Sequence, residues 1–359
     1  MADPELTAAD REALAQARAQ FDHPGIYLDT AAIGLPPRRA LTALHDELDR
    51  WRDGRARPAD YDPYVAEARS RFAGLVGVEP RQVAIGPQVS VMAGLIAASL
   101  PPGSEVLTTQ GEFTSIVFPF HTQPGLKVRE APLAVLADAV TPATRLVCVS
   151  AVQSRDGAIA DLDVLGDACD AAGARILVDG SQAVGWLPLD ASRVAYMVVV
   201  GYKWLLTPRG TTFMTIQDDL LADIVPANAG WYAGEDPWDS LYGTPMKLAS
   251  DARRLDVSPA WHSWVGAVPA LELIGSIRPA ALRAHCVGLA SRFCERTGLP
   301  PTDSAIVSVA TDDAVPDLMR EGDIAGSARA GRLRLSFHLC ADEDDVDRAA
   351  DVLAGHLSA

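Results

Sequence analysis

This chain of 359 residues contains only three lysines, and one of them has a sequence context typical of a catalytic residue. Lys203 follows the apolar run AYMVVV and precedes a turn that contains proline and glycine, in the stretch GYKWLLTPRGTTF. Ligand sites of parallel sheets form at the carboxyl ends of strands, and a partly desolvated lysine placed there can form a Schiff base with a carbonyl group. The other interpretation is a surface lysine that caps a turn.

A carboxylate and an amide precede this lysine at the end of another apolar run. The run RILVD ends in Asp179, and Gln182 follows three residues later. Pyridoxal 5′-phosphate (PLP) needs a carboxylate that keeps its ring nitrogen protonated, which makes the ring an electron sink, and it gains from a donor to its O3′ atom. An Asp at a strand end also occurs as a helix N-cap or metal ligand. Its pairing with Lys203 therefore carries the prediction of a PLP site.

The elements that must position these residues alternate from about residue 83 onward. Short apolar runs bounded by turn residues alternate with helical stretches, as in VAIGP before VSVMAGLIAASL. Apolar strands that alternate with helices indicate βα units and a mainly parallel sheet buried on both faces. We predict an α/β protein with a helical segment at 1–24 that packs on the small domain, a large domain at 25–240 and a small α+β domain at 241–359.

Within the small domain, the apolar pattern predicts a helix near 264–277, strands near 305–311 and 332–339, and a final helix near 342–357. Cys340 would then lie on the strand that contains RLRLSFHL. A segment rich in Gly, Pro and Trp, at about 226–260, separates this domain from the preceding α/β pattern.

Composition excludes several classes of partner. Apolar residues make up 48% and charged residues 22% of the chain, as in ordinary globular proteins. The net charge of −16 argues against nucleic acid or an anionic membrane as a partner. No apolar run of about 18 residues predicts a membrane span, and the charged N-terminal stretch lacks the core of a signal peptide. The five cysteines form no C-x-x-C pair, so we expect a cytoplasmic protein without a metal site or disulfide framework.

The motifs VDGSQAVG (178–185) and GYKWLL (201–206) together resemble the fold-type I PLP enzymes of the class V aminotransferase group. That group includes cysteine desulfurases, selenocysteine lyases, kynureninases and related C–S lyases. The resemblance runs from YLDTAAIGLPP to RLRLSFHLCADEDDVDRAADVL, almost the whole chain. It implies PLP as cofactor, a large domain with a mainly parallel seven-stranded sheet, and a homodimer whose active site is shared between subunits.

The resemblance also implies roles for individual residues around the cofactor. Asp179 would pair with the pyridine nitrogen, Gln182 with O3′, and Lys203 would carry the cofactor. The other cofactor-binding residues implied are Val89 and Ser90 at a turn before a helix, where anions bind, Phe113 stacked on the ring, Tyr202 reaching the phosphate, and Ser258 touching the phosphate of the partner subunit.

Substrate binding is implied for Arg334 and Ser154. The stretch RLRLSFHLCADEDDVDR resembles the family pattern R-x-S-x-x-x-Y-N-x-x-x-D, in which the Arg binds the substrate α-carboxylate as a bidentate pair. Arg332 lies two residues away on the same strand face and is easily confused with Arg334. The chain departs from the pattern at Cys340-Ala341, where relatives often have Tyr-Asn.

The resemblance also narrows the reaction. Cysteine desulfurases need a nucleophilic cysteine roughly fifteen residues before the carboxylate-binding Arg, and the stretch AVPDLMREGDIAGSARAGRLR contains none. The Phe at 113, the GYKWLL motif and the short loop before Arg334 look most like the C–S lyases of ergothioneine-type pathways. Those cleave hercynylcysteine sulfoxide to a thiol-level product, pyruvate and ammonia, with Lys203 here as the base. The alternatives are an aminotransferase, epimerase or kynureninase-like enzyme, and a non-catalytic protein of the same fold.

Aromatic residues cluster in AGWYAGEDPWDSLYG (229–243) and SPAWHSW (258–264). They could line a pocket for an imidazolium or trimethylammonium group, because aromatic faces attract cations. They could equally pack in the core or at a dimer interface.

Overall fold

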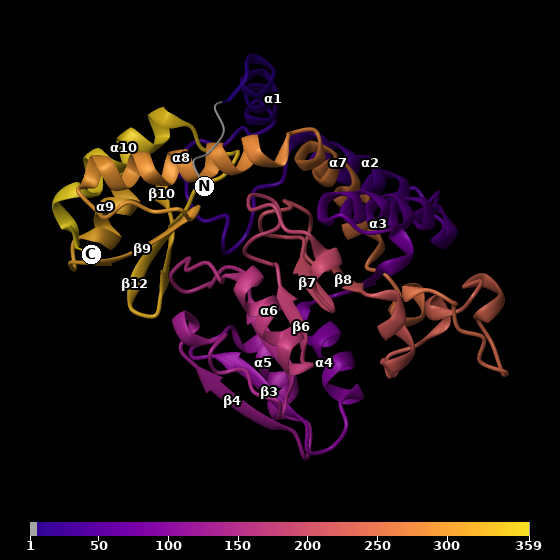
Figure 1. Ribbon diagram of the computed structural model, residues 1–359. Coiled ribbons are helices and arrows are strands. Elements are labelled where there is room, and N and C mark those ends of the chain that lie inside the picture. Colours follow the sequence, from indigo (N-terminus) through magenta and orange to yellow (C-terminus); the bar gives the residue numbers. More distant parts are fainter. Residues whose placement is uncertain (1–5, 359) are drawn as a thin grey trace.

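The structure is a computed structural model that describes residues 6–358, so residues 1–5 of the predicted N-terminal segment lie outside it. A large lobe surrounds a seven-stranded sheet, and a smaller lobe built from the C-terminal part of the chain lies beside it (Figure 1). Strand β8 runs antiparallel to both its neighbours, and the other pairs of the large sheet are parallel. This confirms the predicted mainly parallel seven-stranded sheet. In spatial order its strands are β2 (Val83–Gly86), β8 (Thr212–Ile216), β7 (Tyr196–Val200), β6 (Arg175–Asp179), β5 (Thr144–Ser150), β3 (Glu105–Thr109) and β4 (Lys127–Ala131).

Both faces of this sheet are buried, which is why its strands are apolar without alternation. In β7, Val198 enters one hydrophobic core with α4 (Val89–Ser99) and α5 (Thr114–His121). Its neighbour Val199 enters a second core on the opposite face. That second core also receives side chains from α3 (Asp62–Val76), α6 (Leu162–Ala172) and α7 (Trp261–Gly275). Helix α2 (Arg38–Arg52) packs against α7.

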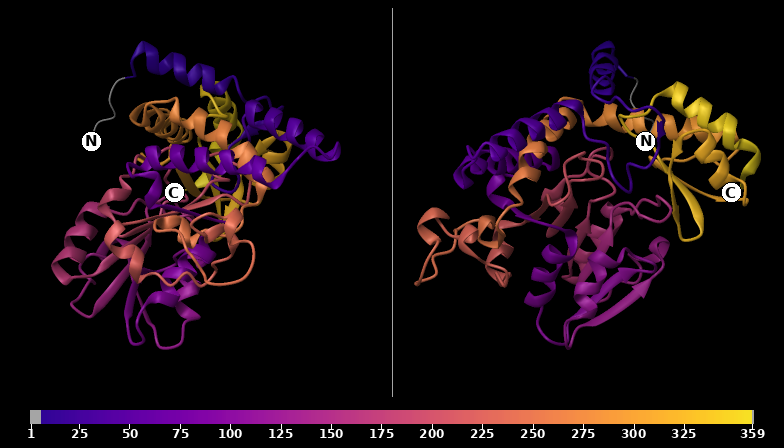
Figure 2. Two further views of the ribbon diagram at one scale, coloured as in Figure 1. Left: turned by 90° about the vertical axis from the view of Figure 1, so that its right-hand side faces the viewer. Right: turned by 180° about the vertical axis from the view of Figure 1, so that it is seen from behind.

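The small lobe has its own antiparallel sheet and its own core. The sheet has the order β11 (Ser327–Arg329), β12 (Arg332–Ser336), β9 (Ile306–Thr311) and β13 (Leu357–Ser358). Phe293 of α8 (Pro279–Thr297), Leu335 of β12 and Leu353 of α10 (Glu343–Leu353) meet in its core, beside α9 (Val315–Glu321). The hairpin of β11 and β12 extends from this lobe toward the large one (Figures 1 and 2).

The N-terminal part of the chain contacts the small lobe. Helix α1 (Ala8–Arg18) reaches α10 through an ion pair between Arg18 and Asp345, whose nitrogen and oxygen lie 3.3 Å apart. Strand β1 (Ile26–Tyr27) pairs in parallel with β10 (Ile324–Ala325). The stretch that contains Asp29 is thereby held against β12, where Asp29 forms a bridge with Ser336.

Two details differ from the sequence expectations. Helix α8 was not predicted, although Pro279 in its first turn and Gly298 at its end, with a φ of 70°, are ordinary helix boundary signals. The predicted strand 332–339 ends at Ser336, and Cys340 lies in a turn closed by a hydrogen bond from the Ala341 N–H to the His338 carbonyl (3.0 Å). The placement of Cys340 on a strand was therefore wrong.

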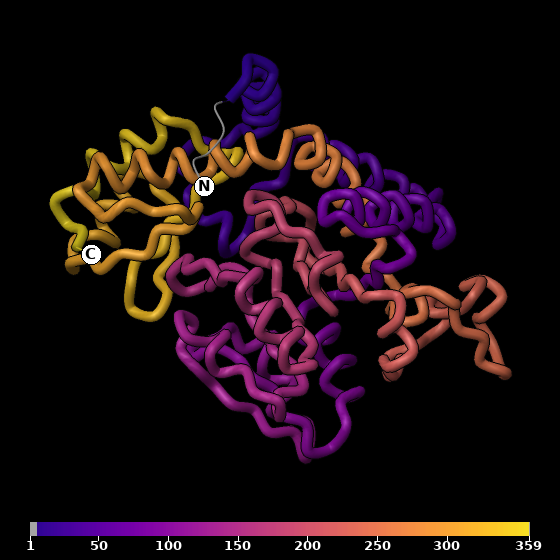
Figure 3. The backbone as a smooth tube through the Cα atoms, viewed as in Figure 1, coloured from indigo at the N-terminus to yellow at the C-terminus, as the bar shows by residue number. Residues whose placement is uncertain are grey.

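The aromatic segment at 229–243 projects from the body of the large lobe (Figure 3). The Trp231 ring packs against those of Tyr232 and Trp238, at centroid separations of 5.2 and 5.1 Å. The Tyr232 hydroxyl and the Trp238 indole N–H both donate to the carboxylate of Asp62, at 3.0 and 2.7 Å. Within the chain these rings therefore pack against one another and are bonded to Asp62, the first residue of α3.

No single helix in the described part of the chain is both long and apolar enough to cross a membrane. Helices α7 and α8 meet that criterion only as a pair, and they are bent by 88° relative to each other.

Candidate active site

The predicted cofactor residues gather at one edge of the large sheet. Asp179 ends β6, Ser150 ends the adjacent strand β5, and the register places these two residues opposite each other. Lys203 follows the end of β7, the next strand along, by three residues. Parallel strands present their carboxyl ends at one edge, where ligands of such sheets bind.

Lys203 is a buried amine without a hydrogen-bond partner among the described residues. Its Nζ atom lies 5.2 Å from the centre of the Phe113 ring and 6.0 Å from that of Tyr202. Burial lowers the pKa of Lys203 to about 8, although the carboxylate of Asp179 opposes that shift. At neutral pH a larger fraction of this amine is therefore uncharged than in an exposed lysine. The uncharged form is the one that acts as a nucleophile or a base.

Asp179 is held by the turn that follows its strand. Its Oδ1 accepts the Ser181 N–H at 2.8 Å, and the Ser181 hydroxyl accepts the Val200 N–H at 3.1 Å. Burial raises the pKa of the Asp179 carboxyl, whereas Ser181 and Lys203 act to lower it. A buried carboxylate in this position gains from a cationic N–H partner, because a hydrogen bond to the charged form offsets its desolvation.

Gln182 and Ser154 connect the cofactor edge to the small lobe. The Gln182 amide nitrogen donates to the Ala31 carbonyl (3.0 Å) and to the Ser154 hydroxyl (3.1 Å), and its oxygen accepts the Trp204 indole N–H (2.7 Å). Both amide hydrogens thus have acceptors inside the chain. A bond from Gln182 to O3′ requires one of these partners to be exchanged.

Arg334 of β12 is only 1% exposed, and its guanidinium lies beside Ser154. Its Nη1 donates to the Ser154 carbonyl (2.6 Å) and hydroxyl (3.1 Å), and its Nη2 donates to the Ser327 hydroxyl (3.2 Å) and lies 3.8 Å from Asp29 Oδ1. Its Nε has no partner among the described residues, nor does Asp29 Oδ1 have a hydrogen bond. Burial lowers the pKa of Arg334 to about 10, so the guanidinium stays charged at neutral pH. A buried guanidinium group with an unpaired N–H is suited to bind a carboxylate ligand.

The turn between β2 and α4 offers backbone donors for an anion. Val89 and Ser90 begin α4, and the Gln88 side chain makes no capping hydrogen bond to them. Such first-turn N–H groups lack partners within a helix and bind phosphate groups readily. A Cβ atom at Gly86 would meet the side chain of Met92, which would have to move. Ser258 is exposed and lines a cavity of about 170 Å³ with Gly86 and Pro87 of its own chain.

These residues fit PLP. The described residues offer a buried amine without a hydrogen-bond partner, a buried carboxylate at a strand end, and the Phe113 ring, which is 44% exposed and close to that amine. The N-terminus of α4 supplies donors for the phosphate.

The model of class V aminotransferases matches residues 26–296. The chain belongs to the class V aminotransferase family. Its cofactor is accordingly pyridoxal 5′-phosphate. Among curated relatives of this class V protein, the uncharacterized aminotransferase YcbU of Bacillus subtilis is 26% identical, over 89% of this chain and 86% of YcbU. The isopenicillin N epimerase of Streptomyces clavuligerus is 28% identical, over 97% of this chain and 98% of the epimerase. The isopenicillin N epimerase of Amycolatopsis lactamdurans is 30% identical, over 81% of this chain and 84% of the epimerase.

Solved structures show the same fold for the class V chain. The cystine C–S lyase C-DES, in complex with cysteine persulfide, matches with a TM-score of 0.83 at 23% identity, over 92% of this chain and 98% of C-DES. The cysteine desulfurase CsdA of Escherichia coli matches with a TM-score of 0.81 at 21% identity, over 94% of this chain and 97% of CsdA. The fold is that of fold-type I PLP enzymes, as the motifs predicted.

Sequence reasoning missed one buried residue of this class V site, Glu112. Its carboxylate accepts hydrogen bonds from the Ser150 hydroxyl (2.6 Å) and N–H (2.8 Å), from the Gln153 amide (3.1 Å) and from the Phe113 N–H (2.7 Å). It thereby joins the end of β5 to the residue that carries the exposed ring. The available signal was an acidic residue in GEFTS, directly before Phe113 and just after β3.

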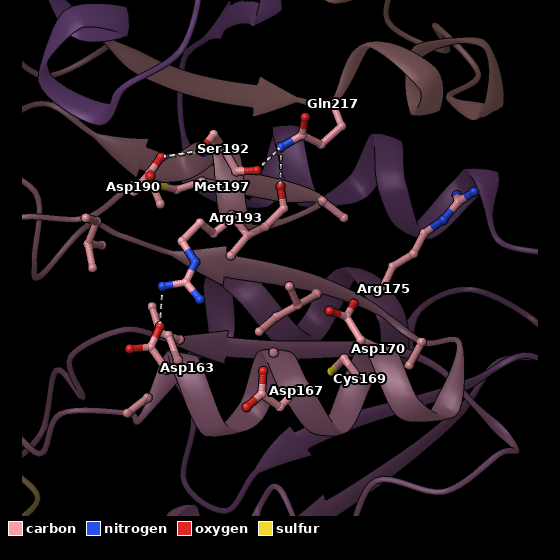
Figure 4. Close-up of a pocket in the computed structure, with 18 of the residues that line it drawn as sticks. Asp163, Asp167, Cys169, Asp170, Arg175, Asp190, Ser192, Arg193, Met197 and Gln217 are labelled. Atoms are coloured by element: carbon pink, nitrogen blue, oxygen red, sulfur yellow. Dashed lines mark hydrogen bonds and ion pairs between the residues drawn. The ribbon is translucent and has the colours of Figure 1, made fainter.

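A large hollow in the surface lies elsewhere. It encloses about 810 Å³ between α6 and the residues around Asp190, Arg193 and Gln217 (Figure 4). Arg175, which begins β6, lines it, whereas Asp179 ends the same strand. The hollow is therefore at the amino ends of the strands, the edge opposite Lys203, and we place the active site at the carboxyl ends.

Proposed function

We propose that this class V family member is a PLP-dependent C–S β-lyase. It would cleave an S-substituted cysteine or its sulfoxide, of the hercynylcysteine type, to pyruvate, ammonia and the sulfur fragment, which is a thiol from the thioether and a sulfenic acid from the sulfoxide. The observation that carries the proposal is a desolvated base, Lys203, in a site whose Arg334 hairpin contains no cysteine. All five thiols are buried, so the chain offers no mobile sulfur nucleophile for persulfide formation.

Each part of the site has a step in this reaction. Phe113 and Asp179 would hold the cofactor, which when bound would supply an electron sink for negative charge at the substrate Cα. Arg334 binds the α-carboxylate, and this orients the Cα–H bond toward Lys203. The Lys203 amine takes that proton, because its lowered pKa makes it a base near neutral pH. The Cβ–S bond then breaks, the sulfur keeps the electron pair, and hydrolysis of the remaining fragment gives pyruvate and ammonia.

A second candidate function is epimerisation of an amino acid. The similarity to two isopenicillin N epimerases, at 28% and 30% identity, favours it. An epimerase must return a proton to the opposite face of Cα, and Phe113 on the stacking face has no proton to give. Transamination, which YcbU's description suggests, needs a 2-oxo acid acceptor.

We also propose a cytoplasmic homodimer in which Ser258 reaches the partner's phosphate site. Five unpaired thiols suit a reducing compartment. Several large apolar side chains are exposed on the isolated chain, which is typical of interaction surfaces. They include Ile33, Trp51, Phe118, Tyr242 and Met246.

The test is a product assay with the PLP-loaded protein in deuterated water. S-substituted cysteines and their sulfoxides should give equal amounts of pyruvate and ammonia without a 2-oxo acid. Inversion of the amino acid with deuterium at Cα and no pyruvate would establish the epimerase instead. Turnover that depends on an added 2-oxo acid would establish the aminotransferase.

A further inference from the structure

Two arginines face each other at the tip of the β11–β12 hairpin. Arg329 and Arg332 are directly opposite in the antiparallel register. The two residues between them, Ala330 and Gly331, both have positive φ angles, of 50° and 76°. A two-residue turn of this kind fixes the flanking pair closely, and a positive φ at alanine is a local cost that the surrounding structure must support.

The tip points its charges toward the active site. Ser327 lies opposite Arg334 in the register and accepts a hydrogen bond from it, so this face of the hairpin is the active-site face. Side chains two residues apart on a strand share a face. Arg329 is therefore on the face of Ser327, and Arg332 is on the face of Arg334. In agreement, Arg329 acts electrostatically on three groups of the site: burial raises the pKa of Asp29 and lowers those of Lys203 and Arg334, and in each case the charge of Arg329 acts to lower the pKa.

This pair has no ion-pair partner in the part of the chain that the structure describes, although the charge of Arg329 acts on Asp29. Neither arginine forms an ion pair there; Arg329 donates to the Ala328 carbonyl (2.8 Å) and Arg332 to the Ser308 carbonyl (3.2 Å). The carboxylate of Asp29 lies beside Arg334 instead. Like charges directly opposite on neighbouring strands destabilise a sheet. An anion between two guanidinium groups replaces this repulsion by charge-assisted hydrogen bonds.

We propose that Arg329 and Arg332 form a second anion-binding subsite, and that the substrate carries a carboxylate at the far end of its side chain. This rests on the proposed function in one respect only, that the substrate is an amino acid whose α-carboxylate binds Arg334. The hairpin then holds both ends of the molecule: Arg334 its α-carboxylate, and the arginine pair its distal carboxylate. The substrate class is thereby narrowed to cysteine conjugates with an acidic S-substituent.

The first test measures binding without turnover. Calorimetry on the PLP-loaded protein would compare the dicarboxylates glutarate, adipate and pimelate with pentanoate, hexanoate and heptanoate. We expect at least one dicarboxylate to bind about 10-fold tighter than its monocarboxylate, the effect of one added charged hydrogen-bond pair. Arg329→Gln and Arg332→Gln should each reduce this preference, and the double variant should abolish it. Arg329→Lys should retain part of it.

The control is Arg320→Gln, an exposed arginine of α9 in the same lobe that pairs with Asp317. It should leave the preference unchanged. Equal affinities for all acid pairs in the unmodified protein, or a preference that survives in the double variant, would overturn the proposal.

A second test separates this inference from the proposed function. Release of pyruvate from S-(2-carboxyethyl)-L-cysteine would be compared with release from S-propyl-L-cysteine. The acidic conjugate should have a kcat/KM about 10-fold higher, again the effect of one charged pair. Arg329→Gln should reduce that ratio through KM, and the double variant should remove it. If neither conjugate gives pyruvate, the lyase proposal fails while the dicarboxylate preference still supports the subsite. If both do so equally well, the subsite proposal fails and the lyase proposal stands.

Discussion

The Nζ atom of Lys203 lies 5.2 Å from the centre of the Phe113 ring, although 90 positions separate the two residues in the chain. Lys203 follows β7 and Phe113 precedes α5, so the sheet itself brings amine and ring together. Lys203 is buried, with only 6% of its surface exposed. This burial is the main cause of the lowered pKa of Lys203 and underlies the first prediction.

The rate at which the apoprotein attaches PLP should rise with pH around a midpoint near 8. The neutral amine is the nucleophile, and burial moves its pKa down from 10.5 to about 8, so the reactive fraction appears at lower pH than in an exposed lysine. Stopped-flow absorbance of the bound cofactor would measure the rate. Lys127→Ala should behave like the unmodified protein and Lys203→Ala should attach no cofactor. A midpoint near 10 would contradict the role given to burial.

Asp179→Asn should keep the cofactor bound but slow its reaction with substrate. An amide cannot offer the negative charge that keeps the ring nitrogen protonated, and a charge-assisted hydrogen bond contributes about 1.5–3 kcal/mol. We expect kcat to fall roughly 10- to 100-fold. Single-turnover kinetics on fully loaded protein would show this, with the exposed Asp190→Asn as the matched control. An unchanged kcat would remove Asp179 from the catalytic group.

Ser154→Ala should raise KM more than it changes kcat. The Ser154 hydroxyl accepts from both Gln182 and Arg334, at 3.1 Å in each case, so its loss loosens the guanidinium that is expected to bind substrate. The Ser154 carbonyl still accepts from Arg334, which limits the effect to a few-fold, about 1 kcal/mol. Arg334→Lys, which abolishes the bidentate fork, should raise KM by at least about 10-fold. Equal effects of the two variants would argue against this division of roles.

Lys203 and Asp179 could be predicted because each follows an apolar strand, and the edge of a parallel sheet is a local property of sequence. The role of Glu112 could not be predicted in the same way, because it depends on β3 and β5 being neighbouring strands of the sheet although β4 lies between them in the sequence. The pairing of Arg329 with Arg332 at the hairpin tip could not be predicted from the sequence either. Arg332 was noted only as a neighbour of Arg334, and its partner Arg329 becomes visible only with the register of β11 against β12.

Glu112→Gln should lower both thermal stability and affinity for the cofactor. The carboxylate accepts four hydrogen bonds, and the glutamine NH₂ group would face donors that it cannot accept. Leaving a buried donor unsatisfied costs about 1–3 kcal/mol. Thermal melts and PLP titrations would measure the two effects, with the exposed Glu130→Gln of β4 as control. A loss of stability with unchanged cofactor affinity would show that Glu112 does not position Phe113.

Arg69→Met should destabilise the large lobe by roughly 3–5 kcal/mol, because it leaves the buried carboxylate of Asp256 unpaired. Arg69 lies on α3 and is bound to Asp256 at 2.6 Å, and Asp256 also accepts the Ile85 N–H at 2.8 Å. The pair therefore ties α3 to β2, the strand that leads to the phosphate turn.

The double variant Arg69→Met, Asp256→Leu should recover much of that loss, since it removes both charges. Asp49→Asn, in an exposed pair with Arg52, should change stability by less than about 1 kcal/mol. Midpoints of urea unfolding would measure each variant. Because β2 precedes Val89 and Ser90, Arg69→Met should also weaken PLP binding more than Asp49→Asn does. A double variant as unstable as Arg69→Met alone would show that packing around Arg69, rather than the charge of Asp256, sets the cost.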